Sequence, residues 1–409
     1  MSSLFKAVTK CRICAETDFA EVVSLGSHPL SGCFPQMSEP DPPLAPLRLV
    51  RCVGCGLVQL AHSVDPARLY TSGYGYRSGI NNTMRNHLAG IAQENIRRFE
   101  PRPGSVILDI GCNDGTLLTQ YPLKHTLLGI DPIASKFDYP ATFTVAENYF
   151  SRDAFNALAQ GRKASIITSI AMFYDLEEPN SFVADIADCL DRDGVWVLEQ
   201  SYMPEMLRRN SYDTICHEHL EYYGLRQIEY LVERHSLRVF DVDLNEINGA
   251  SFRLYVCRAD ASFTNTARLA QLRESEDSSN LKDQGPYDAF RERCLRLRDD
   301  LRRLIETEVA AGKRVHIYGA STKGNTILQF CELDHTLIEA AADRNPEKWG
   351  ARTPVTNIPI ISEDDSRAMQ PDYFLALPWH FKTEFLARES EFRRRGGKFI
   401  FPLPEIAVA

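Results

Sequence analysis

Two histidines flank a glutamate in the stretch YDTICHEHLEYY, which runs from Tyr212 to Tyr223. In the zinc-binding pattern H-E-x-x-H the histidines stand one helical turn apart. Here His217 and His219 are two residues apart, so on a helix their side chains diverge. An imidazole titrates near neutral pH and can abstract a proton from carbon next to a carbonyl group. The stretch is therefore interpreted as a general base site, and a polar surface turn between core aromatics is the alternative.

Four cysteines form two C-x-x-C pairs, Cys11 with Cys14 and Cys52 with Cys55. Each pair makes a tight knuckle with two thiolates, and two knuckles complete a tetrahedral zinc site. Because four thiolates leave no open coordination position, this zinc is predicted to be structural. A thioredoxin-type redox pair is the alternative, but that pair needs a following helix on a βαβ core. The presence of two pairs favours zinc.

A glycine-containing turn follows an apolar run in VILDIGCNDGT, and it holds Asp109, Gly111, Asn113 and Gly115. A strand, such a turn and a helix start bring backbone N–H groups close to a ligand. The spacing D-x-G-x-x-x-G differs from the G-x-G-x-x-G dinucleotide fingerprint. Asp131 follows the next apolar strand, where doubly wound folds place a ribose-binding acid. The turn resembles the first motif of class I S-adenosylmethionine (SAM)-dependent methyltransferases, which implies that these residues contact SAM.

Strand and helix patterns alternate from residue 105 to residue 199, which indicates a mostly parallel sheet. Ligands on such sheets bind beyond the carboxyl ends of the strands. The segments 146–150 and 169–173, which include Asn148, Ser169 and Met172, are therefore predicted to share one cofactor rim with Asp109, Asp131 and Glu199. The glycine- and tyrosine-rich segment 71–81 is interpreted as a lid over the cofactor, or alternatively as a connector. Strands are predicted at 105–110, 126–130, 142–145, 164–170 and 194–199, and helices at 82–99, 116–121, 151–160 and 180–190.

A second strand–turn–helix unit, KRVHIYGASTKGN, follows a charged helical stretch at 261–311. Serine and lysine at such a turn suit an anionic group held by backbone N–H donors. The Walker A pattern is absent. Strands predicted at 314–318, 338–342 and 373–377 make this region a second Rossmann-like sheet with its own ligand rim. A domain that only packs against its neighbours is the alternative.

The composition fits a soluble protein of several domains. Its 409 residues exceed one ordinary core, and the domains are predicted at 1–70, 71–255 and 256–409. The net charge of −9 gives no support for a nucleic-acid or membrane partner. No apolar run approaches about 18 residues, and the N-terminus lacks the apolar core of a signal peptide. Eleven cysteines then favour thiols and metal over disulfides. A cytoplasmic monomer is expected.

The ordered set of motifs, namely the two C-x-x-C knuckles, SGYGYRSG, DIGCNDG and HEH, resembles a known family. It is that of the SAM-dependent sugar C-methyltransferases, which act on nucleotide-linked 4-keto-deoxy sugars in bacteria. The resemblance covers essentially the whole chain. It implies an α/β protein with a class I methyltransferase core, a small N-terminal zinc-binding domain and a C-terminal Rossmann-like domain. It also implies SAM and structural Zn²⁺ as cofactors and a nucleotide-linked keto-deoxy sugar as substrate.

The resemblance also implies roles for individual residues. His219 removes a proton from C-3 of the sugar, next to the 4-keto group, Glu218 supports the site, and Tyr76 lies close to the reacting centre. The resulting enolate then takes the methyl group of SAM. The nucleotide diphosphate lies between the central and C-terminal domains, where the candidates for contact are Ser321, Lys323 and Asn325.

Two positions depart from the family pattern. Cys216 precedes HEH where the family carries a tyrosine, and the loop after the fourth strand has Phe173 or Tyr174 in the place of a histidine. His217 and Tyr222 are the candidates to replace those groups beside the enolate oxygen. The alternatives are an O- or N-methyltransferase, in which His219 deprotonates a hydroxyl, and a non-catalytic zinc-ribbon binding protein.

Overall fold

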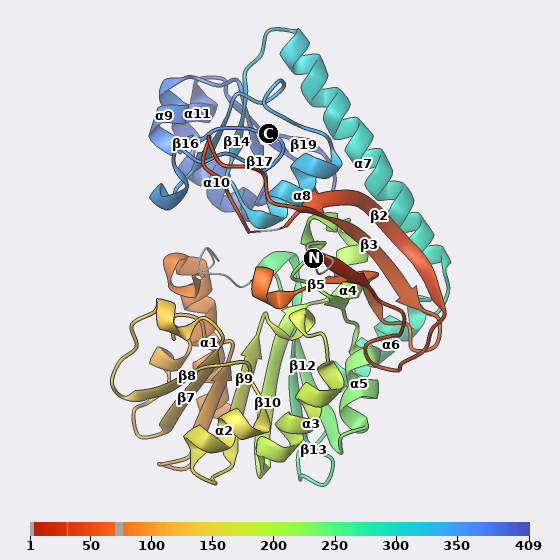
Figure 1. Ribbon diagram of the computed structural model, residues 1–409, viewed down its shortest axis with the longest axis vertical. Helices are drawn as coiled ribbons and strands as arrows, with labels where there is room; N and C mark the ends of the chain where they lie inside the picture. The colour runs from red at the N-terminus through yellow and green to blue at the C-terminus, as the bar shows by residue number, and fades with distance from the viewer. Residues whose placement is uncertain (1–3, 31, 70–76) are drawn as a thin grey trace.

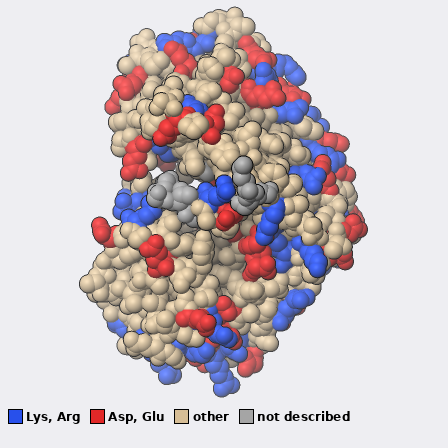
Figure 2. Space-filling model, viewed as in Figure 1, with Lys and Arg blue, Asp and Glu red and all other residues tan. Residues whose placement is uncertain are grey.

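Three regions make up the protein in this computed structural model, which describes residues 4–30, 32–69 and 77–409. In Figure 1 a central sheet lies below and a C-terminal sheet lies above, while the N-terminal strands, in red, run along one side between them. On the face drawn in Figure 2, basic and acidic side chains are interspersed, and the surface is hollowed between the upper and lower parts. No helix among the described residues is both long and apolar enough to cross a membrane.

A four-stranded antiparallel sheet, in the order β11-β4-β3-β2, forms the core of the N-terminal module. Its edge strand β11 comes from the HEH stretch, so that stretch is hydrogen-bonded to the module despite their distance in sequence. A separate pair joins β1 to β5. The bounds are β1 (Phe5–Ala7), β2 (Phe19–Pro29), β3 (Leu44–Cys52), β4 (Val58–Leu60), β5 (His62–Val64), η1 (Pro66–Arg68) and β11 (Glu221–Tyr222).

Seven strands form the central sheet in the order β12-β13-β10-β9-β6-β7-β8. Parallel pairing joins β8, β7, β6, β9 and β10, whereas β13 runs antiparallel to β10 and β12. All five residues of β6 are buried, as expected for a strand covered on both faces. The bounds are β6 (Val106–Ile110), β7 (Thr126–Asp131), β8 (Phe143–Glu147), β9 (Ala164–Ile170), β10 (Leu190–Ser201), β12 (Leu237–Asn245) and β13 (Ser251–Arg258).

Helices cover the central sheet and connect its strands. Helix α1 begins at the N-cap Asn81, whose side chain accepts a hydrogen bond from the Thr83 N–H, as Asn caps commonly do. The bounds are η2 (Ser78–Ile80), α1 (Asn82–Phe99), η3 (Leu118–Gln120), η4 (Ala134–Lys136), α2 (Arg152–Ala159), η5 (Phe173–Asp175), α3 (Pro179–Cys189), α4 (Met203–Arg208), η6 (Tyr212–Thr214), α5 (Leu225–Glu233) and η7 (Ile247–Gly249).

The C-terminal sheet has the order β16-β15-β14-β17-β18-β19 and is parallel except for its last strand. Helix α7 leads into it and lies along β2 (Figure 1). The bounds are α6 (Ala267–Ser278), α7 (Gly285–Ala310), β14 (Val315–Tyr318), α8 (Thr322–Phe330), β15 (Ala340–Asp343), η8 (Pro346–Lys348), β16 (Ile360–Ser362), α9 (Glu363–Ala368), β17 (Tyr373–Ala376), η9 (Trp379–Phe381), α10 (Lys382–Arg388), α11 (Ser390–Arg394), β18 (Lys398–Phe401) and β19 (Ala407–Val408).

The expected helix at 116–121 is wrong, because only the single 3₁₀ turn η3 forms there. The side chain of Asp114 accepts hydrogen bonds from the N–H and the hydroxyl of Thr116, which favours a turn over a helix. Tyr121 then adopts an extended conformation before Pro122. The charged helical stretch 261–311 forms two helices, α6 and α7.

The N-terminal module shares buried apolar clusters with both other regions. Cys11 and Cys52 belong to the same cluster as Trp196 of β10. Val22 of β2 belongs to another cluster with Phe374 of β17. The module therefore packs against both sheets. Of the predicted domain boundaries, residue 70 lies outside the described residues, and residue 255 lies within β13, which ends at Arg258.

Candidate active site

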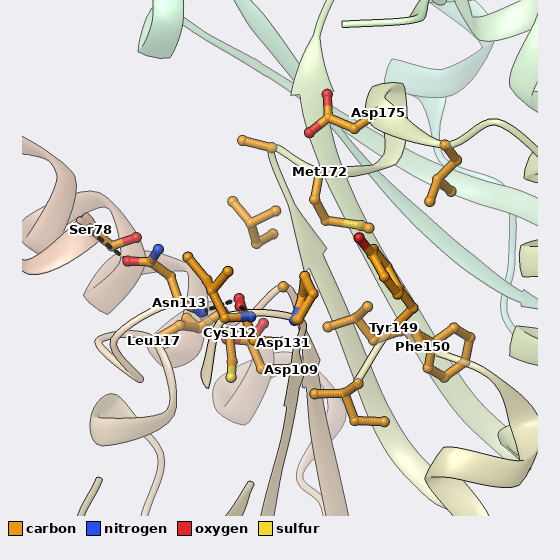
Figure 3. Close-up of a pocket in the computed structure, with 18 of the residues that line it drawn as sticks. Ser78, Asp109, Cys112, Asn113, Leu117, Asp131, Tyr149, Phe150, Met172 and Asp175 are labelled. Atoms are coloured by element: carbon orange, nitrogen blue, oxygen red, sulfur yellow. Dashed lines mark hydrogen bonds between the residues drawn. The ribbon is translucent and has the colours of Figure 1, made fainter. Parts of the chain in front are cut away.

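A cavity of about 430 Å³ lies at the carboxyl ends of the central strands (Figure 3). The predicted cofactor residues that line it come from the turn after β6, the end of β7 and the loops after β8 and β9. They are Asp109, Gly111, Asn113, Asp131, Asn148 and Met172. The residues that could hold a nucleoside thus gather at the rim that strand order predicts.

Asp131 links the two turns at the base of this cavity. One carboxylate oxygen accepts the N–H of Asn113 at 2.8 Å, and the other accepts the N–H of Ile133 at 2.9 Å. Burial raises the pKa of this carboxyl, while the two backbone N–H donors act in the opposite direction. Asp131 therefore fixes the glycine-containing turn and still lines the cavity, as a ribose-binding acid must.

Gly111 lets the turn approach the cavity wall. Its φ of +69° lies in the left-handed region, and a Cβ there would sit 3.1 Å from Cγ of Met172. Nearby, Asp109 is buried and accepts the hydroxyl of Thr168 at 2.7 Å. Burial raises the pKa of Asp109 to about 7. The positive φ favours glycine at position 111, and a Cβ there would require the Met172 side chain to shift by a few tenths of an ångström.

Two predicted cofactor residues lie away from the cavity lining. The hydroxyl of Ser169 is buried and accepts the indole N–H of Trp196 at 2.8 Å. Its neighbour Ile170 lines the cavity instead, because successive side chains of a strand face opposite sides. Gly115, with a φ of +75°, packs under the ring of Tyr139. Gly115 therefore allows the turn its left-handed conformation and does not line the cavity.

The chain just before α1 is held over the cavity by the same turn. The Ser78 N–H donates to the side-chain oxygen of Asn113 at 3.0 Å (Figure 3), and the Gly79 N–H donates to Asp114 at 2.9 Å. The proposed lid at 71–81 and the predicted catalytic Tyr76 fall mainly outside the described residues, which resume at residue 77.

Glu199, Tyr149 and Phe150 line the cavity at the rim where the order of strands predicts them. Glu199 lines the cavity and is held by His87, by Asn245 at 3.0 Å and by Arg253 at 2.8 Å. These partners are distant in sequence, and no local motif marks them. The sequence interpretation missed other lining residues, namely Met84, Leu88, Cys112, Leu117, Asp175, Glu177 and Asn248.

His219 is the least buried residue of the segment 211–225, whose other members are all buried. Its Nδ1 lies 2.8 Å from the carbonyl oxygen of Thr214, which can only accept, so Nδ1 carries the proton and Nε2 keeps its lone pair. The imidazole packs on the ring of Tyr174, with 4.3 Å between centroids. Burial, followed by the charge of Lys323, lowers the pKa of His219 to about 3. The imidazole is therefore neutral at pH 7 and able to accept a proton.

The other members of the HEH stretch face the N-terminal module. The ring Nε2 of His217 lies 3.1 Å from the carbonyl oxygen of Ala45, and burial lowers the pKa of His217 to about 4. Glu218 is buried beside Gly32, where a Cβ would lie 3.5 Å from its carboxylate. The hydroxyl of Tyr222 donates to Thr214 at 3.3 Å. His217 thus points away from His219, whereas Tyr222 shares with His219 the carbonyl oxygen of Thr214.

The predicted diphosphate residues occupy the start of α8. Ser321 caps the helix, since its hydroxyl accepts the Gly324 N–H at 3.0 Å. The ammonium of Lys323 donates to the carbonyl oxygen of Asn248, a residue that lines the cavity, at 3.1 Å. Asn325 lines a separate small cavity against β2, near His28. Of the three, Lys323 brings its charge nearest to the central cavity.

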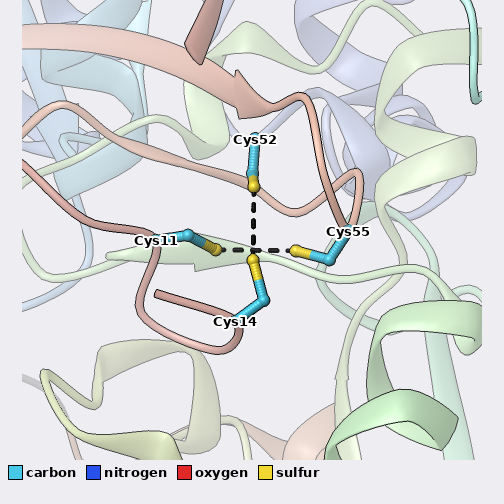
Figure 4. Close-up of side chains that lie close together, drawn as sticks. All are labelled: Cys11, Cys14, Cys52 and Cys55. Atoms are coloured by element: carbon cyan, nitrogen blue, oxygen red, sulfur yellow. Dashed lines mark hydrogen bonds between the residues drawn. The ribbon is translucent and has the colours of Figure 1, made fainter. Parts of the chain in front are cut away.

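The metal residues converge as zinc requires. The four Sγ atoms of Cys11, Cys14, Cys52 and Cys55 lie within 4.8 Å of one another and point toward one centre (Figure 4). Tetrahedral zinc with bonds of 2.3 Å places sulfur atoms about 3.8 Å apart. The Cys11–Cys55 and Cys14–Cys52 separations, 3.5 and 3.4 Å, are close to that value. The cluster fits a closed zinc site.

Comparison with known proteins places the whole chain. The C-methyltransferase NovU from Streptomyces niveus is 30% identical over 424 aligned residues, which cover 100% of this chain and 98% of the relative. The chain belongs to the C-methyltransferase family. Family profiles described as "Putative zinc binding domain", "Methyltransferase domain" and "C-methyltransferase C-terminal domain" match residues 11–70, 84–242 and 246–404 of this C-methyltransferase.

Solved methyltransferase structures are also similar to part of this C-methyltransferase. The magnesium protoporphyrin IX methyltransferase from Synechocystis PCC 6803 covers 45% of this chain and 90% of its own, at 14% identity and a TM-score of 0.34. A methyltransferase in complex with its Trm112 activator from Haloferax volcanii covers 43% and 92%, at 12% identity and a TM-score of 0.34.

Family membership confirms several predictions. The C-methyltransferase is a SAM-dependent enzyme with a class I methyltransferase core and an N-terminal zinc-binding domain. The alternative of a non-catalytic zinc-ribbon protein is therefore wrong. SAM and zinc are its cofactors, and the cavity and the cysteine cluster have the donor groups that each requires.

Replacement of Asp131 by asparagine is expected to weaken binding of S-adenosylhomocysteine (SAH) about 10- to 100-fold, the effect of losing one buried hydrogen bond. The new amide would turn an N–H donor toward a backbone N–H. Calorimetric titration with SAH measures the effect. Asp138→Asn, an exposed acid on the same loop, serves as control and is expected to bind like the parent. Equal affinity in both variants would exclude Asp131 from the cofactor site.

Proposed function

We propose that this enzyme transfers the methyl group of SAM to C-3 of a nucleotide-linked 4-keto-deoxy sugar, with His219 as general base. The observation that carries the proposal is the geometry of His219. Its Nδ1 is tied to Thr214, its Nε2 is free to accept a proton, and its ring packs on Tyr174, next to Asp175 of the cavity lining. Such a fixed, neutral imidazole suits proton abstraction from carbon.

The proton and electron balance of the step is simple. Nε2 of His219 takes the proton from C-3, and the electron pair moves onto that carbon and its neighbouring carbonyl. SAM, when bound, supplies an electrophilic methyl group on its sulfonium sulfur. The new carbon–carbon bond forms as the carbon–sulfur bond breaks, and SAH leaves. The buried surroundings of the HEH stretch keep water from competing for the proton.

Lys323 supports a substrate that carries a diphosphate. Its ammonium donates to the carbonyl oxygen of the cavity residue Asn248, and its charge adds to burial in lowering the pKa of His219. A bound diphosphate would offset that positive charge and raise the basicity of His219. In this proposal the base gains strength only when the nucleotide sugar is in place.

Other assignments stay predictions. Ser321 and Asn325 are proposed to contact the nucleotide with Lys323, while Glu218, His217, Tyr222 and Tyr76 are proposed around the sugar. A monomeric state, a cytoplasmic location, a role in deoxysugar biosynthesis and the absence of nucleic-acid or membrane partners are likewise predictions.

Proton exchange in D₂O tests the proposed function. Nucleotide-linked 4-keto-6-deoxy sugars are followed by NMR with the enzyme and SAH, which blocks methyl transfer. Loss of the C-3 proton signal is the expected result, and loss at C-5 would move the methyl group to that carbon. An enzyme that binds SAH but exchanges no carbon-bound proton would favour the O- or N-methyltransferase alternative.

Replacement of Lys323 by methionine is expected to lower affinity for the nucleotide sugar by at least about tenfold, the value of one lost charge-assisted contact. It also removes a positive charge near His219, so the pKa of that imidazole rises. Since the base works in its neutral form, the acidic limb of the kcat/KM profile shifts to higher pH. Lys382→Met, on exposed α10, is the control. A profile and KM equal to those of the control would contradict the role of Lys323.

A further inference from the structure

We propose that Arg12, inside the first zinc knuckle, is a positioning residue that holds the HEH segment against the cofactor cavity. The proposal depends on the proposed function only for the catalytic role of His219. Arg12 lies between Cys11 and Cys14, so the metal site fixes its backbone. The side-chain amide of Asn180, at the start of α3, donates to the carbonyl oxygens of Arg12 and Ile13 at 3.1 Å.

The guanidinium of Arg12 is buried and held in one orientation. Its Nη1 donates to the side chain of Gln59 at 3.1 Å and to the carbonyl oxygen of Leu60 at 3.0 Å, both in β4. Its Nη2 donates to the hydroxyl of Ser63 at 2.7 Å. The side chain is only 3% exposed. Three acceptors of the N-terminal module thus fix the orientation of the guanidinium next to the central region.

Two carboxylates of the catalytic region meet that cation. Nε of Arg12 lies 3.4 Å from Glu221, whose side chain is fully buried, and Nη2 lies 3.7 Å from Glu177. Glu221 stands two residues after His219, and Glu177 lines the cofactor cavity. Within the described part of the chain, Arg12 is the cation paired with Glu221. One guanidinium therefore contacts an acid of the HEH segment and an acid of the cavity lining, and Glu177 is also paired with Lys6 at 2.9 Å.

Backbone hydrogen bonds make the same connection. Strand β11 pairs with β4, and the Leu60 N–H donates to the carbonyl oxygen of Leu220 at 2.9 Å. The Leu220 N–H in turn donates to the carbonyl oxygen of Tyr174 at 2.7 Å, beside the ring on which His219 packs. A shift of β11 would therefore move His219 relative to the cavity.

The charges explain why Arg12 is needed there. A buried carboxylate without a cation is unfavourable, whereas replacing both partners of a buried ion pair leaves no uncompensated charge. Burial raises the pKa of Glu221 well above its usual range, and the charge of Arg12 acts in the opposite direction. In Arg12→Met, Glu221 loses this only cation partner among the described residues, and β11 is expected to separate from β4. In Arg12→Met/Glu221→Gln, position 221 carries no charge that needs a cation, and β11 is expected to pair with β4 again.

Arg51 provides a matched control. It is also a buried arginine beside a zinc ligand, Cys52, but it contacts the linker before α7. Its Nη1 donates to the carbonyl oxygen of Lys282 at 3.2 Å and its Nη2 to the side chain of Gln284 at 3.3 Å. Arg51→Met therefore removes the same side chain from the same module without unpairing a carboxylate of the catalytic region.

The experiment compares the parent full-length zinc protein with the three variants. Zinc content, amide hydrogen exchange of residues 216–223, SAH affinity and, with a substrate, kcat and KM are measured. Arg12→Met is expected to retain zinc, to exchange the amides of 216–223 at least tenfold faster and to lose at least tenfold in kcat. Arg51→Met is expected to match the parent in exchange and kcat, and the double variant to recover most of both.

Exchange in 216–223 that is no faster in Arg12→Met than in Arg51→Met would overturn the proposal. If Arg12→Met folds poorly, the double variant decides: restored protection supports the proposal, and persistent loss overturns it. Because amide exchange and SAH binding require no sugar, this result stands apart from the identity of the substrate.

Discussion

Replacement of His219 by asparagine is expected to lower kcat about 10²- to 10⁴-fold, the usual contribution of a positioned general base. The asparagine amide can stand where Nδ1 stands and donate to the carbonyl oxygen of Thr214, which His219 contacts at 2.8 Å. The variant therefore keeps the local hydrogen bond and lacks only the atom that accepts the proton. Turnover is measured with the nucleotide sugar found by proton exchange, and SAH affinity by calorimetry.

His235→Asn is the matched control for this variant. His235 follows α5, and its Nε2 lies 3.5 Å from the side chain of Asn180, away from the cavity lining. It is expected to keep full turnover. SAH affinity is expected to be unchanged in His219→Asn, because His219 is outside the cavity lining. Full turnover of His219→Asn would remove this imidazole from the role of base.

The cofactor turn could be predicted because its determinants are local. A buried strand, a glycine with positive φ and an acid after the next strand all lie within one short stretch. Asp131 bonds the backbone of Asn113, which belongs to that same unit. The zinc cluster could also be predicted from the sequence, because each C-x-x-C pair forms half of the site locally. The four thiols that converge in the structure are the four that the sequence predicts.

Ser169 is a residue whose position relative to the cavity could not be predicted from local sequence. The strand was predicted at the observed bounds, 164–170, but the side chains of Ser169 and Ile170 face opposite sides of the sheet. Which of the two lines the cavity depends on the register with the neighbouring strands. The helix predicted at 116–121 does not form for a related reason. Thr116 donates two hydrogen bonds to the side chain of Asp114, and together with the following proline these outweigh the helix propensity of the segment.

The roles of the two histidines in the HEH stretch could be assigned only from the three-dimensional fold. Its sequence indicated imidazole chemistry but not which imidazole performs it. His217 is turned toward Ala45 of the N-terminal module, while His219 is turned toward Tyr174. That difference arises because β11 pairs with β4, a contact between segments far apart along the chain. The contact of Arg12 with Glu221 could not be predicted for the same reason, because the two residues are remote in sequence.

Removal of zinc is expected to have the other large effect, because the metal holds the module on which the catalytic segment is built. Structural zinc contributes about 10–16 kcal/mol to the folding of zinc-finger peptides at pH 7. Here Cys11 and Cys52 also lie in the apolar cluster shared with Trp196 of the central sheet. The loss of the metal should therefore loosen β4, and with it β11 and His219.

Chelation, or the variant Cys52→Ser, is accordingly expected to abolish turnover and lower the melting temperature, while SAH binding declines less. The smaller effect on SAH follows from the cavity, whose acids Asp109 and Asp131 belong to the central sheet. Metal analysis, calorimetric melting and activity after Zn²⁺ is restored measure these effects, with exposed Cys33→Ser as control. A metal-free protein with full activity and an unchanged melting temperature would show that the module is rigid without zinc. Recovery with Zn²⁺ would instead establish that a metal site without catalytic chemistry governs catalysis by holding the base in position.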